Sequence, residues 1–500
     1  MVLHEIINLI KIKKVLILGI LIQLIFGLII SISSLENILK YIMPDDAFYY
    51  FEIAKNVAHG YGVTFDTVNK TNGFHPVWLI LLVPVFYLNL DKILILRIII
   101  LYQLLFAIGE IFFLYKITFK LIKNEILAFF SCILWTFNVY NVSIYLGGTE
   151  ASLNGFILSV IFYYFLKWDF KEKKELHFFA FLLSLSFVIR LDNLIIIIFF
   201  LSWLIFSKKL EIKLNNLKLL LSFFVIIIIL PMCYLSWNYL NFNHFFPISG
   251  ILWGIDIFNI ITYAIFIFII SLFLSLYYRS RPLINVFLVK VESKFIFIIV
   301  ISCLHFPYYL YIRGRIANWY LPLEIMFFSI FIPFLLLNII ELRHSKKVKK
   351  EMIKPSIFIK YSAITFILYI SICFISNYLI INDLFFRHQE DLDIYIVSNW
   401  LNTNTPQDAI IASGNAGKLG YFTDRILIEI WGLVNSFEFV EKYKGNVSKF
   451  IIEGNYDYYV DRVMYFWLSY EELKALGLIL VYEYGKPANS SNCIQVWQKI

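Results

Sequence analysis

Two adjacent acids, Asp45 and Asp46, follow the first long apolar stretch of the chain. Pro44 precedes them, so the pair is predicted to open a helix, whose N-terminus favours an ionised carboxylate. Such an aspartate can act as a general base at neutral pH, although capping of the helix is a simpler role for it. Two ionised neighbours repel each other, so their titration is expected to be coupled. Which of the two acids would accept a proton therefore stays open.

The helix that this pair opens is predicted to be amphipathic. Polar residues recur at intervals of three and four opposite an apolar face, and Gly60-Tyr61-Gly62 ends the pattern. We expect the helix to lie on the outer surface of a membrane. The polar positions are Glu52, Lys55, Asn56 and His59.

A histidine and a glutamate stand in the next polar loops. Asn72 and Gly73 predict a turn in front of His75, where the chain enters a second helix at Pro76. The imidazole could face an anionic headgroup or a phosphate, or it could cap the helix. Glu150 ends the sequence Gly-Gly-Thr-Glu at the mouth of a later apolar segment, where either a functional acid or a polar cap is expected.

Charged side chains also interrupt two apolar regions. Arg190 and Asp192 lie between two short apolar segments, and ionisable groups near membrane depth are candidates for function. A pair between these two side chains that ties a hairpin is the structural alternative. Arg313 and Arg315 flank Gly314, and two guanidinium groups on one loop suit phosphate recognition. They could equally be anchors that reach the membrane interface.

Composition indicates a membrane protein. Hydrophobic residues make up 60% of the 500 residues and charged residues 16%, whereas soluble domains have about 45–50% apolar and ~25% charged residues. The formal net charge of +8 does not indicate nucleic acid, because the lysines lie in short clusters between apolar segments. The 5 cysteines show neither a disulfide framework nor metal-ligand spacing. The chain is therefore predicted to be polytopic and embedded in a lipid bilayer.

The basic clusters predict the orientation. They alternate with segments that hold few Lys or Arg, so the positive-inside rule places the N-terminus and the clusters in the cytoplasm and the acid pair outside. This alternation closes only if the short apolar stretch 76–90 lies at the outer interface instead of crossing. About eleven spans then remain, which leaves the C-terminus outside. They are predicted at 15–33, 97–117, 125–140, 152–167, 176–189, 193–207, 217–237, 255–278, 294–312, 319–341 and 356–379.

The composition changes after residue 380. Residues 1–380 are predicted to form the transmembrane domain, with a first outer loop at 34–96, and residues 381–500 a soluble extracytoplasmic α/β domain. No GxGxxG spacing is present, so a nucleotide site is not expected there; the domain is expected to bind a glycan or to pack over the mouth of the site. Its first strands are predicted at 409–412 and 425–430, with a helix between them at 416–421.

The motifs of the polar loops, taken together, form a pattern that can be compared with known families. Its motifs are Asp45-Asp46-Ala47-Phe48-Tyr49-Tyr50, Thr71-Asn72-Gly73-Phe74-His75-Pro76-Val77-Trp78, Gly148-Thr149-Glu150, Arg190-Leu191-Asp192, Pro247-Ile248-Ser249-Gly250 and Gly432-Leu433-Val434-Asn435. Over most of the chain this pattern resembles the C-type glycosyltransferases (GT-C), which use polyprenyl-phosphate sugars. It is similar to prokaryotic members near the protein O-mannosyltransferases, the lipid A aminoarabinose transferases and the mycobacterial arabinofuranosyltransferases.

The resemblance implies an enzyme that transfers a hexosyl or pentosyl group from a polyprenyl-phosphate donor to an extracytoplasmic glycan, lipid or protein. An acid of the first outer loop, here Asp45 with Asp46 as its neighbour or substitute, would deprotonate the acceptor hydroxyl, and the reaction would invert the anomeric carbon. Ala47 and Phe48 stand where related branches often have Arg or Glu, so no particular substrate is implied. Donor or acceptor binding is implied for Tyr49, Asn72, His75, Glu150, Arg190, Asp192, Arg313 and Arg315.

No cofactor is expected. Some relatives that glycosylate asparagine need a divalent metal, but no evident cluster of acids exists beyond Asp45, Asp46 and Glu150, which favours a metal-independent reaction. A multispan transporter would place paired charges in broken mid-membrane helices repeated in two halves, a pattern not seen here. Such a transporter, or a non-catalytic membrane scaffold for envelope glycan assembly, is the alternative class.

Overall fold

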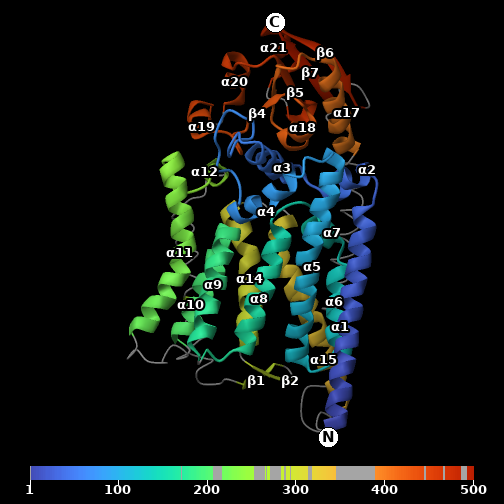
Figure 1. Cartoon of the computed structure of the whole chain (residues 1–500), viewed down its shortest axis with the longest axis vertical. Coiled ribbons are helices and arrows are strands. Elements are labelled where there is room, and N and C mark those ends of the chain that lie inside the picture. Colours follow the sequence, from blue (N-terminus) through green and yellow to red (C-terminus); the bar gives the residue numbers. More distant parts are fainter. Residues whose placement is uncertain are drawn as a thin grey trace.

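The computed structural model describes residues 2–170, 172–206, 217–252, 283–286, 289–292, 294–313, 318–344, 389–443, 446–465, 468–485 and 493–500, as well as residues 265, 267, 269 and 270. Across these residues a bundle of apolar helices carries a sheet-containing domain at one end, and the N-terminus lies at the other (Figure 1). Two helices of the first outer loop, α3 (Asp45–Ala58) and α4 (Pro76–Phe86), lie between the bundle and the sheet domain (Figure 1).

Long apolar helices form the bundle. Within the described residues, α1 (Val2–Ser31), α5 (Lys92–Ile122) and α11 (Leu217–Phe242) contain stretches long and apolar enough to cross a membrane. Large apolar side chains are exposed on α1 and α11, for example Ile25 at 57% and Val225 at 59%. Such exposure is expected for surfaces that face lipid. Shorter helices of the bundle are α6 (Glu125–Thr136), α8 (Ala151–Lys167), α9 (Lys173–Ile189), α10 (Leu194–Phe206), α14 (Lys294–Arg313) and α15 (Pro322–His344).

The predicted helical architecture with a C-terminal α/β domain is confirmed, whereas the number of spans stays a prediction. Each span predicted from 15–33 to 217–237, and those at 294–312 and 319–341, coincides with one of these helices. The spans predicted at 255–278 and 356–379 lie almost entirely outside the described residues.

The helix directions place the lysines near the end of α5, the end of α8 and the start of α9 at the end of the bundle away from the sheet domain. Lys92, at the start of α5, contacts Asp424 of the sheet domain at 2.7 Å, so the lysines near the end of α5 lie far from it. Helix α8 likewise runs away from α3 toward Lys167, and α9 returns from Lys173. Helix α3, which begins with the acid pair, and the sheet domain thus share the end opposite the N-terminus (Figure 1). The strands at the lysine end are β1 (Leu283–Val286) and β2 (Val289–Glu292), which pair antiparallel.

Helix α3 ends as predicted, and part of its polar face is covered. It is followed by Gly60 at φ +87°, as the ending pattern predicts. Its polar stripe is covered in part: Glu52 is only 7% and Asn56 1% exposed, whereas the Lys55 side chain is 27% exposed and His59 is exposed. The Asn56 amide donates to the carbonyl oxygens of Thr64 and Phe65, both at 3.0 Å. The location of this helix at the membrane surface stays a prediction.

Helix α4 does not cross the bundle. It has 11 residues, about 16 Å at ~1.5 Å per residue, which is too short for a ~30 Å hydrocarbon core. Pro76 occupies its first turn, as predicted. The remaining short elements of this part are α2 (Leu35–Asn37), a π-helical turn (Ile38–Ile42), α7 (Val139–Tyr145), α12 (Ile248–Leu252), and 3-10 turns at Leu191–Asn193 and Asn318–Tyr320.

A five-stranded sheet forms the centre of the C-terminal domain, in the order β4-β3-β5-β7-β6. Strand β3 pairs in parallel with β4 and β5, and β7 pairs antiparallel with β5 and β6. The carboxyl ends of the three parallel strands share one edge of the sheet. The strands are β3 (Ile410–Ser413), β4 (Ile426–Glu429), β5 (Tyr458–Arg462), β6 (Leu478–Tyr484) and β7 (Ile494–Lys499). The helices are α17 (Gln389–Asn404), α18 (Ala416–Phe422), α19 (Phe437–Tyr443), α20 (Val447–Glu453), a 3-10 turn (Val463–Tyr465) and α21 (Tyr470–Ala475).

Candidate active site

Glu150 lies in a loop between α7 and α8 that neighbouring side chains hold in place. Gln103 of α5 accepts a hydrogen bond from the Gly148 N–H and donates one to the Thr149 carbonyl, both at 2.7 Å. Trp78 of α4 donates through Nε1 to the Gly148 carbonyl oxygen at 2.9 Å. Glu150 itself is 2% exposed. Because the loop backbone is bound from two helices, the position of its carboxylate is fixed.

The same loop packs directly against α3. Gly148 has φ +84°, a conformation that favours glycine. A Cβ there would lie 2.5 Å from Cζ of Phe51 and 3.0 Å from Cβ of Ala47. The close approach that glycine permits thus brings Glu150 beside the helix that carries the acid pair.

Arg190 bridges two carboxylates at the ends of α8 and α9 that face α3. Its Nη1 donates to Oε1 of Glu150. Its Nη2 and Nε donate to Oδ2 and Oδ1 of Asp192, at 2.8 and 3.1 Å. The ring centroid of Tyr320 lies 5.0 Å from the guanidinium carbon. The predicted hairpin pair with Asp192 is therefore present, together with a second pair to Glu150 that the sequence did not indicate.

Tyr50 and His75 complete this group. The Tyr50 hydroxyl donates to Oε2 of Glu150 at 3.0 Å, and Nε2 of His75 lies 3.5 Å from Oε1 of the same carboxylate. The side chain of His75 is 25% exposed, against 3% for Glu150. His75 is therefore accessible to a ligand from outside. We name Tyr50, His75, Glu150, Arg190 and Asp192 the Glu150 cluster.

The two acids at the start of α3 face different neighbours. Asp46 is exposed and stands one helical turn before Tyr50, whereas Asp45 is half-buried and stands one turn before Tyr49. Burial raises the pKa of Tyr50 well above its usual 10.0, and the charges of Glu150 and Asp46 add to this. Burial likewise raises the pKa of Tyr49, and the charges of Asp45, Glu429 and Asp46 add to this. Because it stands one turn before Tyr50, Asp46 lies on the face of α3 that carries this tyrosine, whose hydroxyl binds Glu150.

Asp45 faces the C-terminal domain instead. Its Oδ1 accepts from the Lys418 N–H at 2.7 Å and its Oδ2 from the Gly417 N–H at 3.0 Å, at the start of α18. Tyr49 lies on the same side, 6% exposed, with its ring centroid 5.5 Å from that of Phe65. Donor or acceptor binding by Tyr49 stays a prediction.

Asn72 is fully buried and ties together two loops. Its Nδ2 donates to Oδ1 of Asn238 at 3.1 Å, and its Oδ1 accepts from the Ile248 N–H at 2.9 Å. These bonds connect the first outer loop to α11 and to the segment that follows it. Asn72 therefore has structural partners away from the Glu150 cluster, and a role in binding stays a prediction.

The side chains of two predicted site residues cannot be placed in the structure, and two residues that contact the site were not predicted. Arg313 is the last residue of α14, but its side chain and the whole of Arg315 lie outside the described residues. Gln103 and Tyr320 were not predicted, although both contact cluster residues or their loop. A polar residue inside a predicted span, as at Gln103, is a signal that could have indicated such a role. Tyr320 is one aromatic residue among many and offers no such signal.

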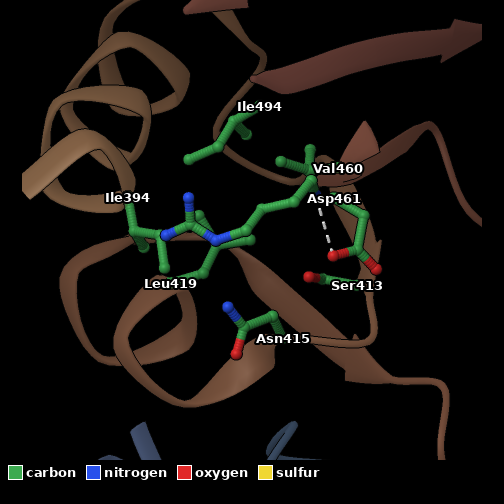
Figure 2. A pocket seen from close by; sticks show the side chains of 8 residues that line it. Ile394, Ser413, Asn415, Leu419, Val460, Asp461 and Ile494 are labelled. Carbon is green, nitrogen blue, oxygen red and sulfur yellow. Dashed lines mark hydrogen bonds between the residues drawn. The ribbon is translucent and has the colours of Figure 1, made fainter. Parts of the chain in front are cut away.

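A small cavity lies at the carboxyl ends of β3 and β5 (Figure 2). Asp461 lines it and accepts from the Gly414 and Arg462 N–H groups, both at 3.0 Å. Burial raises the pKa of Asp461 to about 7, although both hydrogen bonds lower it. The cavity volume of about 10 Å³ has room for about one water molecule, which excludes a sugar. The other lining side chains are Ile394, Ser413, Asn415, Leu419, Val460, Arg462 and Ile494.

Glu429, at the end of β4, predicts a pH-dependent stability. It is 1% exposed and accepts from the Trp431 N–H at 2.7 Å and the Val434 N–H at 3.3 Å. Burial nevertheless raises its pKa from 4.5 to about 8. The folded state thus holds this proton more tightly than the unfolded state, so the stability it contributes is complete below about pH 4.5 and is lost as the pH rises through about 8. We expect the melting temperature of the full-length protein to fall between about pH 5 and pH 8.

Glu429→Gln is expected to reduce this fall, because the amide cannot ionise. Thermal unfolding of both proteins at a series of pH values measures the effect. Glu438→Gln, at an exposed position in the first turn of α19, serves as the control and is expected to keep the wild-type pH dependence. Equal pH dependence in wild type and Glu429→Gln would show that burial of this carboxyl is not the cause.

Comparisons with known proteins place the fold. A family model described as a domain of unknown function (DUF8728) matches residues 385–497, and no curated protein sequence matches the chain. Two crystal structures of ArnT from Cupriavidus metallidurans are similar, one bound to undecaprenyl phosphate and one in the apo state. Each covers 96% of this chain and 97% of its own, at 10% identity and TM-scores of 0.56 and 0.55. The chain therefore shares the fold of these two ArnT structures.

Proposed function

We propose that this protein is a membrane glycosyltransferase that moves a sugar from a polyprenyl-phosphate donor to an extracytoplasmic acceptor. The observation that carries the proposal is that Asp46 stands one turn before Tyr50, whose hydroxyl binds Glu150 of the Glu150 cluster, at one end of an ArnT-like bundle. The ArnT structure with undecaprenyl phosphate supports a lipid-phosphate donor for a chain of this fold. The lysine distribution supports a cytoplasmic N-terminus and an acid pair on the outer face.

Asp46 is the general base of the proposed reaction. It removes the proton from an acceptor hydroxyl, and that oxygen bonds to the anomeric carbon as the bond from this carbon to the phosphate oxygen breaks. Attack opposite the leaving group inverts the anomeric configuration. The polyprenyl phosphate leaves with the bonding electrons, so its oxygen develops negative charge that needs a hydrogen-bond donor or a cation.

His75 is the partner that we assign to this phosphate. Arg190 is 2% exposed and enclosed by Glu150 and Asp192, so its charge is already balanced. His75 is 25% exposed and belongs to the same cluster, where an imidazole N–H can reach a ligand. Arg190 then holds Glu150 in place, and Glu150 orients Tyr50 and His75. The guanidinium groups of Arg313 and Arg315 stay candidates for the same phosphate.

The proposed reaction needs no metal. Base catalysis by Asp46 and hydrogen bonding by His75 supply both proton removal and charge stabilisation in this scheme. Sugar transfer is therefore expected to continue in the presence of a chelator.

The experiment that tests the function uses the full-length protein in lipid vesicles with a labelled polyprenyl-phosphate sugar and a membrane extract as acceptor source. We expect labelled sugar to appear in the acceptor fraction as an equal amount of polyprenyl phosphate is released. Mass spectrometry of lipids that copurify with the protein would identify the sugar. Donor that is bound but never consumed would indicate a scaffold, and donor that changes leaflet intact would indicate a transporter.

A further inference from the structure

We infer that Asp45 is a positioning residue that binds the C-terminal domain to the start of α3 and thereby aims Asp46 at the Glu150 cluster. The inference rests on the proposed function, in which Asp46 is the base. It assigns separate roles to the two acids and gives the C-terminal domain a part in the active site.

Both carboxylate oxygens of Asp45 are engaged by the C-terminal domain. Oδ1 accepts from Lys418 and Oδ2 from Gly417, so one side chain satisfies two of the N–H groups that the start of α18 leaves without partners inside the helix. The carboxylate also lies at the start of its own helix, where negative charge is favoured. These oxygens therefore face backbone donors of the chain itself, which leaves them poorly placed to take a proton from a substrate.

Gly417 permits this contact. A Cβ at this position would lie 2.2 Å from the backbone oxygen of Asp45 and 2.7 Å from its Oδ2. The nearest atom in the first of these clashes belongs to the backbone, so it cannot move aside as the end of a flexible side chain could. Any larger residue would thus push the start of α18 away from the start of α3.

Further contacts hold α18 along its whole length. Lys418, 1% exposed, donates through Nζ to the Leu39 carbonyl oxygen at 2.9 Å. The Tyr421 hydroxyl donates to the Lys92 carbonyl oxygen at 2.9 Å, and its ring lies 5.4 Å from that of Phe48 between centroids. All residues of α18 are buried. Helix α18 of the C-terminal domain is therefore held by contacts with the start of α5 and with the first outer loop.

The geometry of α3 connects this contact to the base. Successive residues of an α-helix point about 100° apart, since a turn takes ~3.6 residues. When Asp45 is held against α18, Asp46 points toward the side of Tyr50, whose hydroxyl is bound to Glu150. A small displacement of a catalytic group can reduce a rate by about 100-fold. The contact to α18 therefore controls where the base stands.

Kinetics separate the two roles. Asp45→Asn places an amide NH₂ where one oxygen now accepts an N–H, so we expect the rate of sugar transfer to fall by about 10- to 100-fold. An aspartate base becomes inactive when it is protonated, so wild-type activity is expected to fall as the pH becomes acidic. Asp45→Asn still has the base, so its activity is expected to fall in the same pH range. Asp46→Asn removes the base, and with it both the rate and that dependence on pH.

A second measurement does not depend on activity. We expect amide hydrogen exchange in α18 to become at least about tenfold faster in Asp45→Asn, because one N–H group loses its acceptor and the other is left with a neutral one. Gly417→Ala keeps both carboxylates but pushes the start of α18 away from α3. We expect this variant to transfer sugar more slowly, with the same fall of activity at acidic pH as wild type. Asp457→Asn is the matched control: Asp457 also accepts a backbone N–H, from Ile410 at 2.8 Å, within the C-terminal domain, and both transfer and α18 exchange should stay at wild-type values.

The outcomes distinguish the inference from the proposed function. Faster α18 exchange in Asp45→Asn, in a protein that transfers no sugar even as wild type, would support the interdomain contact and reject the glycosyltransferase. Unchanged α18 exchange would overturn the inference whatever the activity. If the transfer rate of Asp45→Asn no longer fell at acidic pH, the inference would also be overturned, since Asp45 would then be the base.

Discussion

Asp46→Asn is expected to lower the rate of sugar transfer by at least about 1,000-fold in a protein that still folds. General bases contribute roughly 10²- to 10⁴-fold to the rates of enzymes, and an amide cannot accept the hydroxyl proton. Asp46 is exposed at the start of α3, so an amide of the same shape leaves the packing of the helix unchanged. Initial rates at saturating donor, together with the melting temperature, measure the effect.

Glu36→Gln provides the matched control for this prediction. Glu36 is an acid of the same outer loop, its side chain is 49% exposed, and it pairs with Lys40 one turn along the chain. Its loss is expected to leave the transfer rate within about twofold, because an exposed pair contributes little. If Asp46→Asn retained more than a tenth of the wild-type rate, the assignment of the base to Asp46 would be rejected.

Arg190→Gln is expected to destabilise the protein by about 3–5 kcal/mol and to abolish transfer with it. The substitution leaves the carboxylates of Glu150 and Asp192, 3% and 7% exposed, without the cation that balances them. Glu150 would then lose the position from which it binds Tyr50 and His75. The melting temperature and the transfer rate of the same preparation measure both effects.

Arg190→Lys separates charge from geometry. Lysine keeps the positive charge but cannot form the forked hydrogen bonds that reach both carboxylates, so we expect an intermediate loss of stability. Lys174→Gln is the control, because this lysine pairs with Glu172 on an exposed surface at the other end of the bundle and should leave the melting temperature unchanged. A melting temperature of Arg190→Gln equal to that of wild type would show that the buried cluster does not hold the site together.

Local patterns were sufficient to predict most of the elements. The run of apolar residues, the proline at the start of α4 and the glycine after α3 each act through the backbone of a few neighbouring residues, and the structure has the corresponding helices. The change of composition after residue 380 likewise predicted an α/β domain, whose strands β3 and β4 lie where they were expected. Periodicity also showed which side of α3 is polar, but not what covers that side.

The sequence by itself determined that apolar helices form a bundle, that an acid pair opens a helix and that a sheet domain follows. Only the tertiary structure decided which acid faces the cluster, because that depends on contacts between distant segments: Asp45 binds residues 372 and 373 positions further along the chain. The same holds for Arg190, a candidate phosphate ligand until Glu150, 40 positions earlier, is found against it. A side chain's type and neighbours in sequence set its chemistry and its side of a helix, whereas its charge balance and exposure are set by what packs around it.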